Sequence, residues 1–358
     1  MLGKLKRPSP WDPLLASPER LGPPGNPKTR SRRCSKVGYM QVHLVAVQTE
    51  VQALPYTSAE GFRQYVLELA QAATRGLPEH EPRIIAFPEA FALPLLFWLD
   101  TPKAIREAST SLQAALRLIR ENWRAILGLG VLSPAVFYHL RARQVWTVYE
   151  QVFREAAQAT GAYMVAGSIF SPLMDWEPTR GLHTQGQRAY NLSLVISPQG
   201  TVLGRVPKVH LTAQERMAFL SPGQAGKQTI QTRVGRIANL ICLDAFHESL
   251  IEQADAVGAW LVVQPSANAA RWNGPWSADP GKIEGEVWLG EGLAKKLQNR
   301  ENLRYGLNPM LNGHLYDLYF EGKSGIYQAG GPLALADGAV GHAVVRAAVK
   351  LPDGCAMV

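Results

Sequence analysis

The stretch VGRIANLICLDAFHES, at Val234–Ser249, constrains the fold more than any other part of the chain. An apolar, β-prone run, Ile237–Ile241, leads directly to Cys242, after which the chain turns. The next segment, Ala245–Val257, has the pattern of a helix and is closed by Gly258. A strand, a tight turn and a helix in this order are typical of a layered α/β domain. A residue at such a turn is held rigidly, and its side chain can face a cleft.

The same alternation of strands and helices runs along the chain from Met40. Apolar residues at every second position predict strands, and apolar residues at helical spacing predict helices. Strands are predicted at Met40–Gln48, Arg83–Phe87, Tyr163–Ser168, Ala259–Gln264, Leu315–Phe320 and Gly341–Leu351, with a hairpin formed by Asn191–Ser197 and Thr201–Val206. Helices are predicted at Ala59–Thr74 and Glu286–Arg304, and a polar loop at Thr179–Arg188. The fold class predicted from this order is α/β.

Two further helices are predicted between the second and third strands. One carries apolar residues at helical spacing from Leu112 to Leu127, and the other from Val145 to Ala156. The apolar segment between them, Ile126–Phe137, is too short to span a bilayer. We interpret it as a packed joint between helices, and a lid or a weak membrane-surface contact are the alternatives.

The charge of the protein is concentrated at its N-terminus. The net charge of the 358 residues is +8, and residues 1–38 hold nine Lys or Arg against Asp12 and Glu19. Their seven prolines and few large apolar residues predict a disordered basic extension, followed by one domain over residues 39–358. Translation starting at Met40 is an alternative. The nearly neutral body argues against nucleic-acid binding.

The cysteine content and hydropathy bear on where the protein works. The sequence holds three cysteines, Cys34, Cys242 and Cys355, which favours a reducing, cytoplasmic setting over a disulfide framework. Without an apolar run of the length of a bilayer span, we expect no stable membrane insertion. The eight histidines show no zinc-ligand spacing, so neither a metal nor a cofactor is expected.

Candidate chemistry begins with Cys242, since a nucleophilic thiol needs a base to take its proton and a cation to stabilise the oxyanion it creates. Glu89, in FPEAF, follows a predicted strand. Lys208, in GRVPKVHL, follows the predicted hairpin and precedes Glu215. Each residue also has a purely structural explanation. Cys242 could be an inert core cysteine, Glu89 a charge at a helix N-terminus, and Lys208 with Glu215 a solvated ion pair.

The three fragments FPEAF, GRVPKVHL and ANLICLDAF resemble, in this order, the nitrilase superfamily of carbon–nitrogen hydrolases, which use a Glu-Lys-Cys triad. The resemblance covers about Met40 to Phe320 and implies a four-layer αββα sandwich. It implies that Cys242 attacks the substrate carbon, that Glu89 acts as general base and acid, and that Lys208 stabilises the oxyanion. The backbone N–H of Leu243 would assist Lys208.

Further positions match the family less specifically. Glu215 matches a second glutamate that positions substrate and water. Asn268 and Trp272 lie where members place substrate-contacting residues. Members usually associate through a helical face, so a homodimer or higher homo-oligomer is expected by analogy.

Two departures from the family pattern concern the substrate side. The segment after Cys242 reads CLDAFHE, in which His247 replaces a proline and one residue is missing. A helical insertion is also expected at about residues 93–140. Leu243-Asp244 is more similar to amidases and carbamoylases than to nitrilases.

The predicted function is hydrolysis of a small linear amide or N-carbamoyl compound through a thioester on Cys242, with release of ammonia. The alternatives are nitrile hydrolysis by the same triad, N-acyl transfer to an amine, and a non-catalytic binding or scaffold role.

Overall fold

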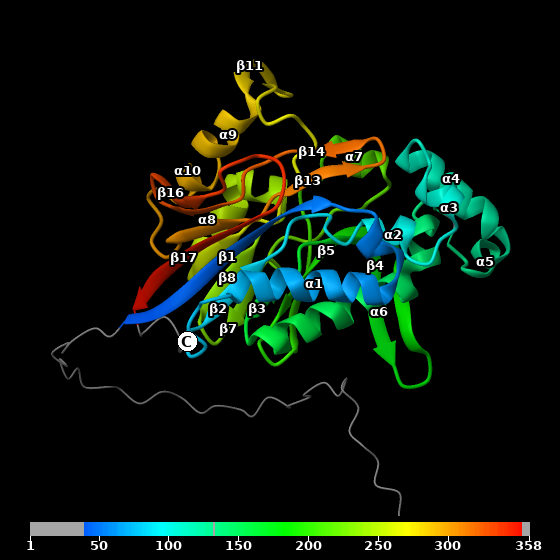
Figure 1. Ribbon diagram of the computed structural model, residues 1–358, viewed down its shortest axis with the longest axis horizontal. Helices are drawn as coiled ribbons and strands as arrows, with labels where there is room; N and C mark the ends of the chain where they lie inside the picture. Colours follow the sequence, from blue (N-terminus) through cyan, green and yellow to red (C-terminus); the bar gives the residue numbers. More distant parts are fainter. Residues whose placement is uncertain (1–38, 132, 353–358) are drawn as a thin grey trace, which may run out of the picture.

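The computed structural model describes residues 39–131 and 133–352, which form a sandwich of two β-sheets covered by helices on both outer faces (Figure 1). The first sheet has nine strands: β1 (Tyr39–Val51), β2 (Arg83–Ala86), β3 (Tyr163–Val165), β4 (Ile169–Glu177), β5 (Gly181–Ile196), β6 (Val202–Pro207), β13 (Leu311–Leu315), β14 (Leu318–Phe320) and β17 (Ala343–Pro352). The second has six: β7 (Thr229–Thr232), β8 (Gly235–Asn239), β9 (Ala259–Val263), β12 (Tyr305–Asn308), β15 (Gly325–Gln328) and β16 (Gly331–Leu335). β10 (Pro275–Trp276) and β11 (Asp279–Ile283) pair separately.

The helices fall into three groups. On the outer face of the first sheet lie α1 (Ala59–Thr74) and α6 (Val136–Thr160), and on that of the second lie α8 (Glu248–Ala256), α9 (Glu284–Glu291) and α10 (Leu293–Lys296). α2 (Pro94–Trp98) is buried beside η1 and α6, and beyond it a helical segment projects from the side of the sandwich: α3 (Lys103–Arg106), α4 (Ser111–Glu121) and α5 (Trp123–Gly128). The short elements η1 (Leu54–Thr57), α7 (Ala213–Met217) and η2 (Cys242–Phe246) complete the chain.

The alternation of side chains along each strand produces the four layers. In β1, Val42, Leu44 and Ala46 belong to the core between the sheets, whereas Val45 and Val47 belong to the core beneath α1 and α6. Successive side chains of a strand point to opposite faces, so a strand covered on both faces is apolar throughout. β9 also contributes to two cores, the central one and that of the α8 layer, but a register shift against β8 puts both Trp260 and Leu261 in the central core. The expected αββα sandwich is confirmed.

The centre of each sheet is parallel, which positions the site. β1, β2 and β3 run parallel in the first sheet, and β8, β9 and β12 run parallel in the second. The carboxyl ends of parallel strands lie along one edge of a sheet, and ligands bind there in open α/β sheets. The segments that follow β2, β8 and β9 meet at this edge.

Four local predictions were wrong. The strand expected at Leu315–Phe320 spans a hairpin turn, because β13 ends at Leu315, Tyr316 has φ +55° and Leu318 pairs back with Leu315. Most of the expected polar loop Thr179–Arg188 belongs to β5, where Leu182 pairs with Trp176 and Gln185 with Leu173. The antiparallel ladder joins backbone groups and so needs no apolar alternation. The helix expected at Ala245–Val257 is split at His247, whose backbone is extended.

The helix expected at Glu286–Arg304 also ends early. It breaks at Gly292, where an added Cβ would lie 2.2 Å from the carbonyl oxygen of Trp288, and α10 ends at Lys296. The following backbone N–H groups of residues 301–303 bond instead to the Asp255 carboxylate. A side chain far away in sequence thus competes successfully with helix formation.

The two predicted helices on either side of Ile126–Phe137 are present as α4–α5 and α6. Ala135 and Phe137 are buried, and the ring of Phe137 lies 5.5 Å from that of Phe97. The described part of the segment therefore packs at this end as a helix joint. Leu132, the extension 1–38 and the cysteines at 34 and 355 lie outside the described residues. None of the helices within 39–131 and 133–352 is long and apolar enough to cross a membrane.

Candidate active site

Cys242 lies in a strained turn three residues after the end of β8. Its backbone φ is +49°, a conformation that residues other than glycine rarely adopt. Two hydrogen bonds hold it there, because its N–H donates to the carbonyl of Pro265 at 2.8 Å and its carbonyl accepts from the Gln264 side chain at 2.9 Å. The turn is thus fastened to the end of β9. The thiol is free and the residue is 8% exposed.

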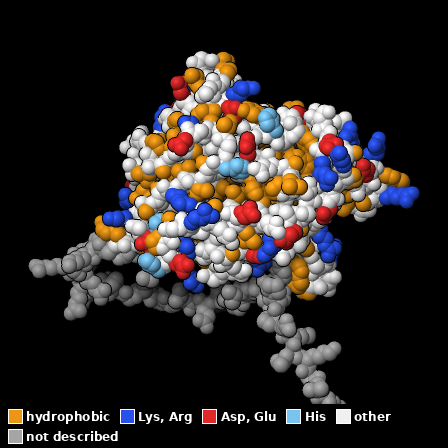
Figure 2. All heavy atoms as spheres, in the orientation of Figure 1, with side chains coloured by type: hydrophobic (Ala, Val, Ile, Leu, Met, Phe, Trp, Pro, Cys, Tyr) orange, Lys and Arg blue, Asp and Glu red, His pale blue; other side chains and the backbone are white. Residues whose placement is uncertain are grey.

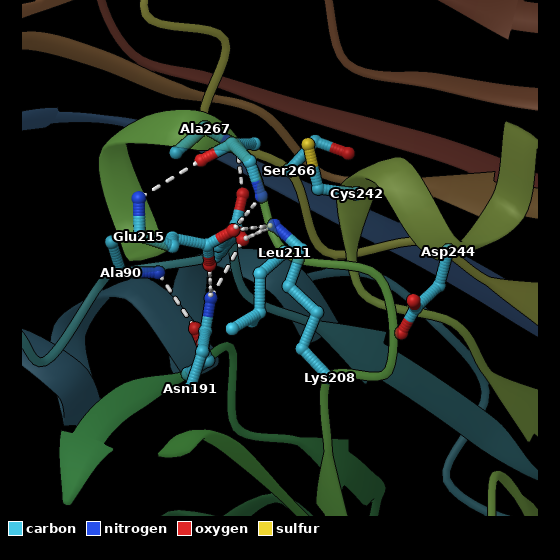
Figure 3. Close-up of polar contacts among 12 residues, drawn as sticks. Ala90, Asn191, Lys208, Leu211, Glu215, Cys242, Asp244, Ser266 and Ala267 are labelled. Atoms are coloured by element: carbon cyan, nitrogen blue, oxygen red, sulfur yellow. Dashed lines mark hydrogen bonds and ion pairs between the residues drawn. The ribbon is translucent and has the colours of Figure 1, made fainter. Parts of the chain in front are cut away.

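Lys208 forms the centre of a buried charged cluster beside this turn (Figure 3). It follows β6, and its side chain is 1% exposed. The ammonium Nζ lies 2.7 Å from Glu89 Oε1 and 2.8 Å from Glu215 Oε2. Lysine is almost never buried unless it is paired. The interpretation of Lys208 and Glu215 as a solvated surface pair is therefore wrong.

Glu89 lies three residues after the end of β2, and its carboxylate links several members of the cluster. Its Oε1 accepts from Lys208 and from Asn191, and its Oε2 accepts the backbone N–H of Ala267 at 3.0 Å. Its charge is also close enough to raise the pKa of the Cys242 thiol. The next residue, Ala90, has φ +56° and donates its N–H to Ser168 Oγ at 2.8 Å. The loop is therefore fixed on both sides of the carboxylate.

A glycine allows this loop to approach β3. Gly167 has φ +65°, and an added Cβ would lie 2.1 Å from the carbonyl oxygen of Pro88. Such contacts do not occur between real Cβ atoms and backbone, so any larger residue must displace the loop. The position of Glu89 thus depends on a residue almost eighty positions away.

Asn191 is a member of the cluster that the sequence analysis missed. Its amide nitrogen donates to Glu89 Oε1 at 2.8 Å and to Glu215 Oε1 at 2.7 Å (Figure 3). Its backbone carbonyl also accepts the N–H of Lys208. The available signal was a polar residue inside the apolar strand run YNLSLVI, since a buried amide requires partners.

Glu215 is oriented by its own helix. It occupies the third position of α7 and forms a capping box with Thr212, whose N–H donates to Glu215 Oε2 at 2.8 Å. Its other oxygen accepts from Asn191. Both carboxylate oxygens are therefore used within the protein, and the residue positions Lys208 and Asn191.

Asp244 connects the lysine turn to the cysteine turn. Its buried carboxylate accepts the backbone N–H groups of Val209, at 3.1 Å, and of His210, at 2.7 Å. The imidazoles of His210 and His247 stack with ring centres 3.5 Å apart. Burial raises the pKa of Asp244 to about 6, against the effect of these N–H donors.

The electrostatics of the cluster oppose a resting thiolate. Burial and the nearby Glu89 charge raise the pKa of Cys242 well above its ordinary value. Burial also raises the pKa of Glu89, and the Lys208 ammonium only partly offsets this. Burial alone would lower the pKa of Lys208, but the charges of Glu89, Cys242 and Glu215 raise it. Lys208 therefore stays charged, and the proton of the site resides on Cys242 or Glu89.

The remaining predicted positions lie near the thiol with different surroundings. Trp272 belongs to the same apolar cluster as Cys242, together with Ile241, Trp288 and Met310. Asn268 uses its amide nitrogen to bond the Glu321 carbonyl at 3.1 Å, and the Glu321 carboxylate accepts the Trp272 N–H at 2.7 Å. Glu321, also missed from sequence, thus holds the loop that carries both residues.

Leu243 occupies the first turn of η2, where backbone N–H groups lack partners within the helix. This leaves its N–H available to a ligand beside the thiol. Among residues 39–131 and 133–352, no group of three or more His, Cys, Asp or Glu side chains is arranged to hold a metal ion. A surface hollow of about 560 Å³ over α6, lined by Trp146, Glu150 and Arg154, shares no residue with the cluster.

Comparisons with known proteins bear on the family and the fold. The family model of carbon-nitrogen hydrolases matches residues 44–287, which include the predicted triad and the second glutamate, Glu215. A search of curated proteins gives no match.

Solved structures of the amidase from Nesterenkonia sp. AN1 are similar in fold. A mutant showing Michael addition of acrylamide at its active-site cysteine is 19% identical, with a TM-score of 0.56 over 87% of this chain and 93% of that chain. A double mutant in complex with acrylamide is 17% identical, with a TM-score of 0.57 over 88% and 92%. The amidase after removal of its His-tag is 20% identical, with a TM-score of 0.55 over 88% and 94%.

Proposed function

Because the chain belongs to the carbon–nitrogen hydrolase family, we propose that it hydrolyses a small linear amide or N-carbamoyl compound through a thioester on Cys242. The observation that carries the proposal is the buried cluster in which Glu89 pairs with the Lys208 ammonium and its charge acts on the Cys242 thiol. This arrangement supports the roles of base, cation and nucleophile for these three residues.

The first half of the reaction forms the thioester. Glu89 takes the thiol proton as the sulfur of Cys242 attacks the carbonyl carbon, and the electrons of the C=O bond move to the oxygen. Lys208 and the N–H of Leu243 stabilise this oxyanion. When the intermediate collapses, the C–N bond breaks and Glu89 returns the proton to the nitrogen, so ammonia leaves.

The second half regenerates the enzyme. A water molecule gives its proton to Glu89 and attacks the thioester carbon. The C–S bond then breaks, the carboxylic acid leaves, and the sulfur recovers the proton. Lys208 remains protonated throughout, as its raised pKa requires.

The experiment is detection of the thioester by intact mass after incubation with amides, nitriles and carbamoyl compounds. We expect an acyl adduct with the amide or carbamoyl members, its loss in Cys242→Ala, and no turnover in Glu89→Ala or Lys208→Ala. Substantial turnover by Lys208→Ala would contradict the mechanism. An added amine acceptor distinguishes acyl transfer, because the product is then a new amide. Reaction with nitriles alone would favour nitrile hydrolysis. If Cys242 reacted with none of these compounds, a non-catalytic binding role would be favoured.

We propose two further properties by analogy with the family. The protein acts in the cytoplasm, and it associates as a homodimer or higher homo-oligomer. Light scattering at several protein concentrations measures the second property directly.

A further inference from the structure

The projecting helices α4 and α5 expose an unusual number of large apolar side chains. Leu112 and Leu116, one turn apart on α4, are 68% and 56% exposed, and Trp123 and Leu127, one turn apart on α5, are 55% and 74% exposed. We call these four residues the apolar stripe. Single exposed apolar residues are normal, but four of them on two successive helices point to an interaction site.

The stripe is not the inner face of an undocked helix. The opposite side of α4 is buried through Ala114 and Leu118, which belong to the core shared with α1 and α6. The helix start is also fastened, because Thr110 caps it and the N–H of Ser111 donates to Asp317 at 2.7 Å. The insertion thus has its own core contacts, and the stripe is additional apolar surface.

Basic residues surround the stripe. Residues 101–131 hold five Lys or Arg against two Glu. Arg117, Arg120 and Arg124 form no ion pair within residues 39–131 and 133–352, and the Arg124 guanidinium lies 5.3 Å from the centre of the Trp123 ring. Figure 2 shows basic and hydrophobic side chains gathered together at the edge of the molecule formed by α3–α5. The partner of this surface must therefore be apolar and anionic.

We propose that the apolar stripe docks reversibly on an anionic lipid surface. Leucine and tryptophan on one side of short helices, with arginine beside them, suit the boundary between headgroups and acyl chains. Basic residues next to such a surface add attraction to anionic lipids. A second copy of the chain fits less well, because a symmetric contact would bring the two sets of arginines together.

The insertion is rigidly joined to the rest of the protein. The Trp98 indole N–H donates to the hydroxyl of Tyr316 at 2.7 Å, and that hydroxyl lies 3.0 Å from the carbonyl of Ile105. These bonds fasten α2 and α3 to the tip of the β13–β14 hairpin. Docking through the stripe would therefore orient the whole sandwich relative to the lipid.

The test is flotation of the full-length protein with vesicles of phosphatidylglycerol and phosphatidylcholine in equal amounts, compared with phosphatidylcholine alone. We expect binding to the anionic vesicles, weakened by salt. The double variant Leu116→Ser/Leu127→Ser should partition at least tenfold more weakly, because two apolar side chains no longer leave water. Arg120→Gln/Arg124→Gln should bind more weakly and with a smaller salt dependence.

The matched control is Leu333→Ser, which alters an exposed leucine on β16, far from α4 and α5 (Figure 1). It should bind as the unaltered protein does, and circular dichroism melting should show that every variant is folded. Every variant keeps the basic residues 1–38, so equal binding by Leu116→Ser/Leu127→Ser would assign the lipid contact to them and overturn the proposal. Absence of vesicle binding by the unaltered protein would also overturn the proposal. If light scattering then showed a lower mass for Leu116→Ser/Leu127→Ser than for the unaltered protein, the occupant of the stripe would be a second copy of the chain.

Discussion

Replacing Asn191 by alanine removes a neutral side chain that, like the Lys208 ammonium, donates to both buried carboxylates. Its amide nitrogen lies 2.8 Å from Glu89 and 2.7 Å from Glu215, and the residue is fully buried. Alanine leaves both carboxylates short of a donor and opens a small space between them. The substitution therefore tests whether the amide positions the cluster or merely fills the interior.

The magnitude follows from the bonds that remain. A hydrogen bond to a charged group contributes about 1.5–3 kcal/mol, so two such bonds set an upper limit of about 6 kcal/mol. Glu89 keeps Lys208 and the Ala267 N–H, and Glu215 keeps Lys208 and the Thr212 N–H. Since each carboxylate retains two donors, we expect the free energy of unfolding to fall by about 2–4 kcal/mol. Displacement of Glu89 should lower kcat/KM about 100-fold.

The pH profile separates positioning from stability. Loss of an N–H donor destabilises the ionised carboxylate, so the pKa of Glu89 should rise further above its ordinary value. A general base works in its ionised form, and the acidic limb of the kcat/KM profile should therefore move to higher pH. Asn312→Ala is the matched control, because Asn312 is equally buried, donates to the neutral carbonyl of Gly341 at 3.1 Å and also has an unpaired amide oxygen.

We expect Asn312→Ala to lower stability by about 1–2 kcal/mol without moving the pH profile. If Asn191→Ala retained both the activity and the acidic limb of the unaltered enzyme, the amide would have no part in holding Glu89. The same conclusion would follow if both variants moved the limb equally.

Three other substitutions test further parts of the structure. Gly167→Ala should lower the free energy of unfolding by about 3 kcal/mol more than Gly186→Ala does, and it should also reduce turnover. Both glycines have φ near +65°, but only at Gly167 would an added Cβ collide with a loop. Equal effects of the two substitutions in thermal melts would contradict this prediction. Lys208→Ala should lower the free energy of unfolding by about 3–5 kcal/mol, because it leaves two carboxylates buried without their cation. Cys242→Ala should change the free energy of unfolding little. Denaturant unfolding of both variants measures the difference. Asp255→Ala should lower stability by about 1 kcal/mol at neutral pH. Partial burial raises the pKa of this carboxylate, but three backbone N–H donors outweigh burial and hold the pKa below its ordinary value. The difference should therefore vanish as the pH falls through the lowered pKa, and a difference that persists in acid would refute this.

The central strands β1, β2, β3, β8 and β9 and the positions of the candidate triad could be predicted because their signals are local. Helix α1 has the predicted bounds, Ala59–Thr74, and its apolar residues repeat at helical spacing after the Ser58 cap. The predicted positions of Glu89, Lys208 and Cys242 came from short fragments at strand ends. Glu89 and Cys242 follow parallel strands, and Lys208 follows β6, which runs antiparallel to β5. Periodicity and fragment order therefore carry information that survives folding.

The supporting contacts could not be predicted because each depends on a distant partner. Asn191 is a single polar residue in an apolar strand, and its partners are 102 and 24 residues away. The end of the predicted helix at Arg304 depended on Asp255, whose carboxylate binds the backbone of residues 301–303. Such bonds arise only once the sheets are assembled, so a local pattern does not encode them.

The charge balance of the cluster favours a neutral thiol before substrate binds. Lys208 supplies one positive charge against the carboxylates of Glu89 and Glu215, so a thiolate would add a third negative charge in a buried site. Proton transfer from sulfur to Glu89 leaves the number of charges unchanged, and attack then moves the new negative charge from sulfur to the substrate oxygen. Since that oxygen is exactly the atom that Lys208 and the Leu243 N–H can reach in the proposed mechanism, formation of the nucleophile is coupled to the presence of a carbonyl that can accept its charge.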